Sequence, residues 1–142
     1  AGRCQVEELT SWTLINDTYN ANPVSMRAAC ETLAEWKTNG RRFLVLGDML
    51  ELEESSANAH QDLGEFASRQ RIDSLFAYGF HAKDVVAGAT KHKSRGQTIM
   101  ATSNVEELVE NLMKQLRPGD VILVKGSRGM RMERVVEALR AA

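Results

Sequence analysis

The sequence predicts an α/β domain with a mostly parallel β-sheet and helices packed on both of its faces. Short runs rich in apolar and β-branched residues alternate along the chain with longer segments whose apolar residues recur at helical spacing. One of these runs, residues 43–46, is continuously apolar, which is typical of a strand covered on both faces. Regular alternation of strand and helix favours parallel strands joined by right-handed crossovers.

The first strand and helix illustrate this pattern. Residues 12–16 form a short apolar run, and a helix is expected from Pro23, which suits the first helical position, to about Lys37. The apolar residues of this helix share one face, and they are Met26, Ala29, Cys30 and Leu33. We therefore expect Cys30 to be a small buried hydrophobic residue.

The later elements continue the alternation. Strands are expected at residues 43–46, 74–78, 98–101 and 121–124, and helices at about 56–69 and 82–89, from a Ser103–Glu106 capping box to Pro118, and from about Met130 onwards. No internal repeat or second-domain boundary is visible in the sequence. The prediction is therefore one Rossmann-like, three-layer domain over residues 1–142.

Composition excludes several classes of function. The 142 residues carry a formal net charge of −1, which argues against general nucleic-acid binding. No apolar run approaches the roughly 18 residues of a membrane span. The two cysteines do not cluster, which suits a reducing cytoplasm. The first residues include no Met, and we expect this chain to be cut from a longer protein.

Catalytic and metal-binding motifs are missing from the sequence. It contains no G-x-x-x-x-G-K-[ST] phosphate loop and no G-x-G-x-x-G fingerprint. The histidines, His60, His81 and His92, lack metal-ligand spacing, although a helical His60 facing a cleft stays a minor candidate. No Ser/His/Asp or Cys/His set can be assigned. We therefore expect a binding domain with no catalytic residue or metal site of its own.

Three polar segments follow predicted strands. They are residues 17–23 (DTYNANP), residues 47–52 (GDMLEL) and residues 125–128 (KGSR). Ligands of open α/β sheets bind at the carboxyl ends of the strands, so these segments predict one shared site. Asn22 before Pro23 is also a good helix N-cap, and a structural role for it stays open. Carboxylates, a phenol and amides suit a nucleotide or a small polar ligand.

The same segments carry a family resemblance over essentially the whole chain. DTYNANPVSM (17–26), VLGDMLEL (45–52) and VKGSRGMRME (124–133), in this order, resemble the C-terminal domain of the Mur ligases. Within this family, the segment GDMLEL resembles the corresponding segment of the branch that adds D-alanyl-D-alanine. The resemblance implies an ATP-dependent ligase whose N-terminal UDP-sugar domain and central ATPase domain are absent from this chain. By itself the chain is then expected to be inactive.

The resemblance also implies roles for individual residues. ATP would contact Arg3, Asp17, Tyr19 and Asn20, with Arg3 frayed in a fragment that lacks the other domains. The dipeptide would contact Asn22, Asp48, Lys125, Ser127 and Arg128. For Asp17 and Asp48, capping of a turn is the competing interpretation. Arg131 and Arg134 are expected to be ordinary helix-surface charges.

The resemblance also has implications for cofactors, substrates and cellular location. The resemblance implies ATP and Mg²⁺, with metal ligands mostly outside this chain, and the partners D-alanyl-D-alanine and UDP-N-acetylmuramoyl-tripeptide. It implies a monomeric, cytoplasmic enzyme of peptidoglycan synthesis, which serves cell shape and cell division. Two alternatives stay open: a Mur ligase branch that adds a single amino acid, and a standalone nucleotide- or partner-binding module.

Overall fold

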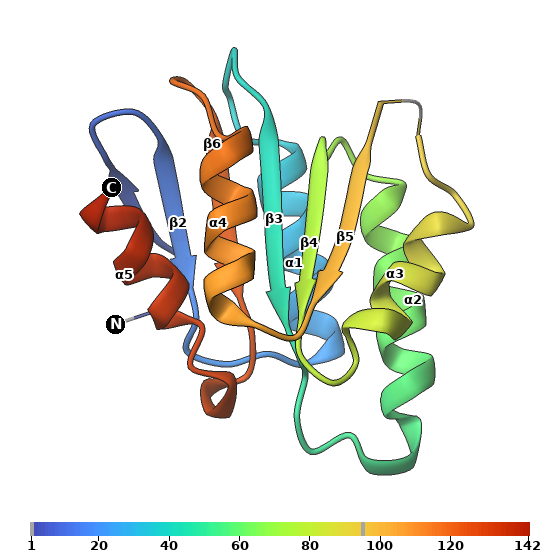
Figure 1. Ribbon diagram of the computed structural model, residues 1–142. Helices are drawn as coiled ribbons and strands as arrows, with labels where there is room; N and C mark the ends of the chain where they lie inside the picture. The colour runs from blue at the N-terminus through green and yellow to red at the C-terminus, as the bar shows by residue number, and fades with distance from the viewer. Residues whose placement is uncertain (1, 95) are drawn as a thin grey trace.

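The computed structural model describes residues 2–94 and 96–142, and it contains one central sheet (Figure 1). The strand order is β1-β2-β6-β3-β4-β5, with β1 antiparallel to β2 and every other neighbouring pair parallel. The strands are β1 (Gln5–Glu8), β2 (Thr13–Asp17), β3 (Arg42–Gly47), β4 (Ser74–Tyr78), β5 (Thr98–Thr102) and β6 (Val121–Lys125). The predicted mostly parallel sheet is therefore confirmed.

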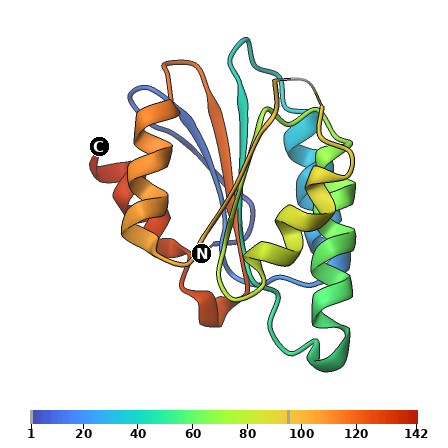
Figure 2. The same cartoon turned by 45° about the vertical axis from the view of Figure 1, so that its right-hand side comes forward.

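Helices cover both faces of the sheet, which gives three layers (Figure 2). On one face lie α1 (Pro23–Ala34), α2 (Ser56–Ser68) and α3 (Ala82–Thr90), and on the other lie α4 (Val105–Gln115) and α5 (Glu133–Ala141). Two short 3₁₀ turns, η1 (Glu53–Ser55) and η2 (Arg128–Met130), follow β3 and β6. None of the helices in the described residues is long and apolar enough to cross a membrane.

The core explains why the strands are apolar along their whole length. Successive residues of β3 point to opposite faces, so Leu44 and Leu46 pack with α1 to α3 while Phe43 and Val45 pack with α4 and α5. All of the residues expected on one face of α1 are buried. Among them Cys30 is fully buried, and burial raises the pKa of its thiol to about 12. The prediction for Cys30 is confirmed.

Some element boundaries differ from the predicted ones. Strand β1 was not predicted, because an edge strand of mostly exposed residues has no apolar run. Helix α4 is capped by Asn104, whose side chain accepts a hydrogen bond from the Glu107 N–H, so the Ser103–Glu106 capping box was wrong. Helix α1 ends at Ala34 instead of Lys37, and α5 begins only at Glu133, after η2.

Candidate functional site

The predicted site lies around the carboxyl end of β6. The connections from the neighbouring strands β2 and β3 lead to α1 and α2 on one face, whereas β6 leads to α5 on the other. Such a point, where neighbouring connections diverge to opposite faces, leaves a crevice at the sheet edge. All three polar segments of the sequence end there, at the lower edge of the sheet in Figure 1.

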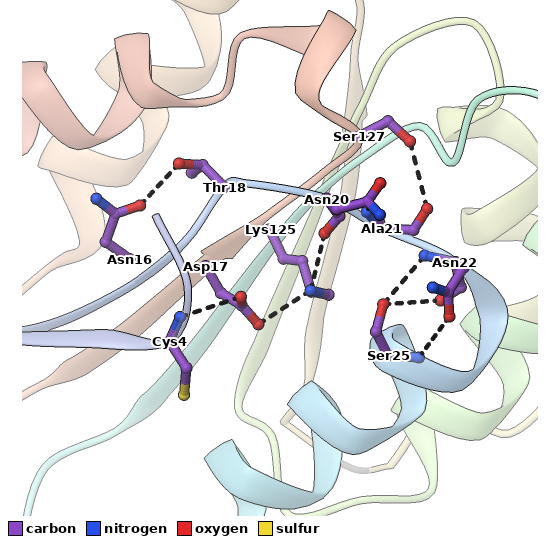
Figure 3. A network of polar contacts seen from close by, with 10 residues as sticks. All are labelled: Cys4, Asn16, Asp17, Thr18, Asn20, Ala21, Asn22, Ser25, Lys125 and Ser127. Atoms are coloured by element: carbon purple, nitrogen blue, oxygen red, sulfur yellow. Dashed lines mark hydrogen bonds and ion pairs between the residues drawn. The ribbon is translucent and has the colours of Figure 1, made fainter. Parts of the chain in front are cut away.

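A partly buried ion pair joins two of these segments (Figure 3). Lys125 Nζ lies 3.0 Å from Asp17 Oδ2 and also donates to the carbonyl oxygen of Asn20 at 2.9 Å. The Lys125 side chain is 4% exposed and that of Asp17 is 18% exposed. Asp17 Oδ1 accepts from the Cys4 N–H. The Lys125 ammonium is thus occupied by bonds to Asp17 and to the β2–α1 loop. The Asp17 carboxylate remains partly exposed to solvent.

The amides predicted as ligands also hold the β2–α1 loop. Asn22 Oδ1 accepts from the Ser25 N–H at 2.8 Å and the Asn22 N–H donates to Ser25 Oγ, which is a complete capping box (Figure 3). Asn20 Oδ1 accepts from the Ala21 N–H. The structural interpretation of Asn22 therefore matches its observed contacts.

Ser127 connects three loops. Its hydroxyl accepts from the Leu50 N–H at 2.8 Å and lies 3.4 Å from the carbonyl oxygen of Ala21, to which it donates. The Ser127 N–H donates to the carbonyl oxygen of Asp48 at 3.0 Å. Ser127 is only 6% exposed and its hydroxyl already bonds two other loops, so these contacts describe a structural role beside the predicted one in binding the dipeptide.

Asp48 is likewise a structural acceptor. Its Oδ2 accepts from the Phe80 N–H at 2.9 Å and its Oδ1 from the His81 N–H at 3.0 Å, so the carboxylate holds the β4–α3 turn. This turn starts at Gly79, whose φ of 121° brings the backbone against the Asp48 carboxylate. The competing interpretation of Asp48 as a turn cap agrees with these bonds.

His60 is also satisfied inside the protein. The fully buried ring contacts the Ser56 carbonyl oxygen through Nδ1 at 2.6 Å and accepts from the Met49 N–H through Nε2 at 3.0 Å. These two bonds describe a neutral ring that donates from Nδ1. Burial lowers the pKa of His60, and the ring stacks on His81 with centroids 4.5 Å apart. His60 therefore supports the β3–α2 loop and does not face the crevice.

Tyr19 lies between two arginines at the surface. The guanidinium carbon of Arg3 is 3.9 Å from the centroid of the Tyr19 ring, and that of Arg128 is 5.3 Å away. The Arg3 guanidinium, with a smaller effect of Arg128, lowers the pKa of the exposed phenol. Arg3 was expected to be frayed, and instead it lies against this ring. A hollow of about 300 Å³ lies beside Tyr19 and Arg128.

A second hollow, of about 340 Å³, opens between the three loops. We call it the β6 hollow. Its lining includes the predicted residues Asn20, Asn22, Ser127 and Arg128, and also Ala21, Leu50, Glu51 and Gly129. Leu50 and Glu51 were not predicted as site residues, although they belong to the GDMLEL segment that was singled out. The structure thus brings the three segments together as expected.

The chain matches the model of the Mur ligase family described as "Mur ligase, glutamate ligase domain" over residues 2–128.

The chain belongs to this family.

Relatives of known name agree with the family assignment. The UDP-N-acetylmuramoyl-tripeptide–D-alanyl-D-alanine ligase of Bacillus subtilis is 37% identical over 127 residues, which are 89% of this chain and 28% of that protein. The MurF of Acinetobacter baumannii superposes with a TM-score of 0.86 at 33% identity, over 99% of this chain and 31% of that one. The MurF ligase of Thermotoga maritima, solved in complex with ADP, gives a TM-score of 0.81 at 31% identity and similar coverage.

This Mur ligase chain spans less than a third of these relatives' length. Its crevice offers exposed groups for binding, above all Tyr19, Glu51 and Arg128, on a frame of internal hydrogen bonds. No group of three or more His, Cys, Asp or Glu residues that would hold a metal ion occurs in residues 2–94 and 96–142. The arrangement is therefore suited to binding and orienting ligands.

Proposed function

We propose that this chain is the C-terminal domain of an ATP-dependent ligase that joins D-alanyl-D-alanine to UDP-N-acetylmuramoyl-tripeptide. The observation that carries the proposal is the convergence of the three polar loops on the crevice at β6, in a chain that is 37% identical to a ligase of that name. The UDP-sugar domain and the ATPase domain would lie outside residues 1–142. Peptidoglycan synthesis, and through it cell shape and division, would be the cellular role, in the cytoplasm.

In this proposal the domain positions two substrates. ATP would convert the terminal carboxylate of the tripeptide to an acyl phosphate, releasing ADP, and the amine of the dipeptide would displace phosphate to form the new amide. Holding the amine next to the acyl carbon in a closed site would speed the reaction, because a bimolecular step becomes effectively unimolecular. The Mg²⁺ that accompanies ATP would be held mostly by residues outside this chain.

The ATP side of the crevice would be formed by Arg3, Asp17 and Tyr19. A guanidinium is always charged and presents a fork of donors to phosphate oxygens. Asp17 keeps 18% of its side chain exposed and retains acceptor capacity for ribose hydroxyls beyond its bonds to Cys4 and Lys125. Tyr19 offers an exposed aromatic face next to the Arg3 guanidinium.

The dipeptide side would be the β6 hollow. There Arg128 is the exposed group that suits a carboxylate, while Ser127 and Asp48 hold the loops and Lys125, Asn20 and Asn22 hold the β2–α1 turn. The buried residues among them, Ser127, Asp48 and Lys125, would therefore act by positioning the site.

An acceptor-dependence assay on the complete reading frame tests this function. Phosphate release from ATP is expected only when UDP-N-acetylmuramoyl-tripeptide and D-alanyl-D-alanine are both present, and residues 1–142 alone should release none. Turnover with single amino acids but not with the dipeptide would assign the chain to another Mur ligase branch. Absence of turnover with every acceptor would favour a standalone binding module.

A further inference from the structure

The β6 hollow carries two opposite charges. Of the side chains that line it, only Glu51 from the β3–α2 loop and Arg128 from η2 are charged. None of the ion pairs among residues 2–94 and 96–142 includes either of them. Both side chains belong to exposed residues. The carboxylate and the guanidinium are therefore both open to a ligand, on loops that approach from different strands.

The backbone holds Glu51 in place. Its φ of 64° lies in the left-handed region, which residues other than glycine rarely adopt. The preceding residue, Leu50, is fixed by the bond from its N–H to Ser127 Oγ at 2.8 Å. Leu50 also lies against Gly129, where an added Cβ would come within 2.8 Å of its Cδ1. An unusual backbone conformation next to an anchored residue is a feature that often marks functional loops.

Asp48, an acidic residue of the same β3–α2 loop as Glu51, is not available to a ligand. Both carboxylate oxygens of Asp48 accept backbone N–H groups, the residue is 4% exposed, and it does not line the hollow. The lining of the hollow is also partly apolar, because Ala21 and Leu50 contribute to it and Leu50 is 41% exposed. A ligand with an ammonium group, small apolar side chains and a carboxylate would complement a lining that combines a carboxylate, apolar side chains and a guanidinium.

We propose that Glu51 binds the ammonium group of the incoming D-alanyl-D-alanine while Arg128 binds its carboxylate. This inference rests on the proposed function and adds to it the residue that recognises the amino end of the dipeptide. Charge-assisted hydrogen bonds at both ends would select a free dipeptide over analogues blocked at either end. Glu51 is assigned to substrate selection, and no proton-transfer step is assigned to it.

A titration of the isotopically labelled chain by NMR tests the inference. Free D-alanyl-D-alanine is compared with N-acetyl-D-alanyl-D-alanine and with D-alanyl-D-alanine amide. We expect Glu51→Gln to weaken binding of the free dipeptide about tenfold, as for loss of one charge-assisted hydrogen bond, and to leave the already weak N-acetylated analogue unchanged. Glu54→Gln is the matched control, because Glu54 is exposed, lies on η1 and does not line the hollow.

The outcomes separate the inference from the function on which it rests. If Glu51→Gln binds the free dipeptide as the Glu54→Gln control does, the role of Glu51 is refuted while the proposed function stands. Equal weakening of the free and the acetylated dipeptide by Glu51→Gln would also refute it, since the effect would not involve the ammonium. No binding of the dipeptide by the unaltered chain at millimolar concentration would contradict the inference, and the acceptor-dependence assay on the complete reading frame would then decide the proposed function separately.

Discussion

Lys125 Nζ lies 3.0 Å from Asp17 Oδ2, although 108 positions separate the two residues in the chain. The pair joins the ends of the parallel neighbours β6 and β2, where Asp17 is also the Cα partner of Lys125 in the sheet register. Removing one partner of such a pair leaves a poorly hydrated charge behind. The bond to Asn20 extends the effect to the β2–α1 loop.

Lys125→Met should therefore lower the free energy of unfolding by about 2–4 kcal/mol, with the lower end favoured because Asp17 keeps some solvent contact. The double variant Asp17→Asn/Lys125→Met should recover part of this loss, because no charge is then left without a partner. Urea unfolding of the two variants measures both values. A single variant as stable as the unaltered chain would mean that water compensates Asp17 fully.

The neighbours Ser127 and Arg128 should behave in opposite ways. Ser127→Ala removes the acceptor of the partly buried Leu50 N–H and should cost about 1–2 kcal/mol of stability. Arg128→Gln changes an exposed side chain and should alter stability by less than about 0.5 kcal/mol. Thermal and urea unfolding distinguish the two. Comparable losses for both variants would show that Arg128 also supports the fold.

The sequence predicted the fold well because the apolar runs of an α/β sheet record burial directly. It missed β1, whose residues are mostly exposed, and it placed the cap of α4 one residue early, because Ser103 and Asn104 are both good caps. The convergence of the three polar segments followed from the parallel sheet. The sequence could not predict which side chains face the crevice. Lys125 is buried and Arg128 is exposed, and only long-range contacts decide this difference.

Gly88 tests how α2 and α3 pack against each other. A Cβ added at Gly88 would lie 1.9 Å from the Gln61 carbonyl oxygen, which belongs to the backbone of α2. Helix propensity alone predicts that Gly88→Ala gains about 1 kcal/mol. Because the clash is with backbone, we expect a net loss of about 1–3 kcal/mol instead.

The control for Gly88 is Ala87, an exposed residue of the same helix. Ala87→Gly should cost only about 0.5–1 kcal/mol, through helix propensity. Urea unfolding of both variants gives the comparison. A stabilised Gly88→Ala variant would mean that the two helices separate at little cost.

His60 should make stability depend on pH in the mildly acidic range. Burial lowers its pKa in the folded state below the value of about 6.5 expected in the unfolded chain. The unfolded chain then binds the proton more tightly, so stability rises with pH through this range. The contribution of His60 is complete above about pH 6.5 and is lost as the pH falls towards the folded-state pKa.

The groups around His60 together favour its neutral ring in the folded state. His81 stacks on it and opposes its protonation, whereas the Ser56 carbonyl oxygen, Asp48 and Asp84 favour the charged form less strongly than burial disfavours it. Protonation at Nε2 would break the bond from the Met49 N–H and loosen the β3–α2 loop.

His60→Gln isolates this contribution, because an amide oxygen accepts a hydrogen bond as Nε2 does and does not titrate. We expect the urea midpoint of the unaltered chain to fall more steeply between pH 7.5 and 5.5 than that of His60→Gln. Carboxylates such as Glu65, whose pKa is lowered by its bond to His92, contribute equally to both proteins and cancel in the difference. Parallel pH profiles would show that His60 titrates alike in the folded and unfolded chains.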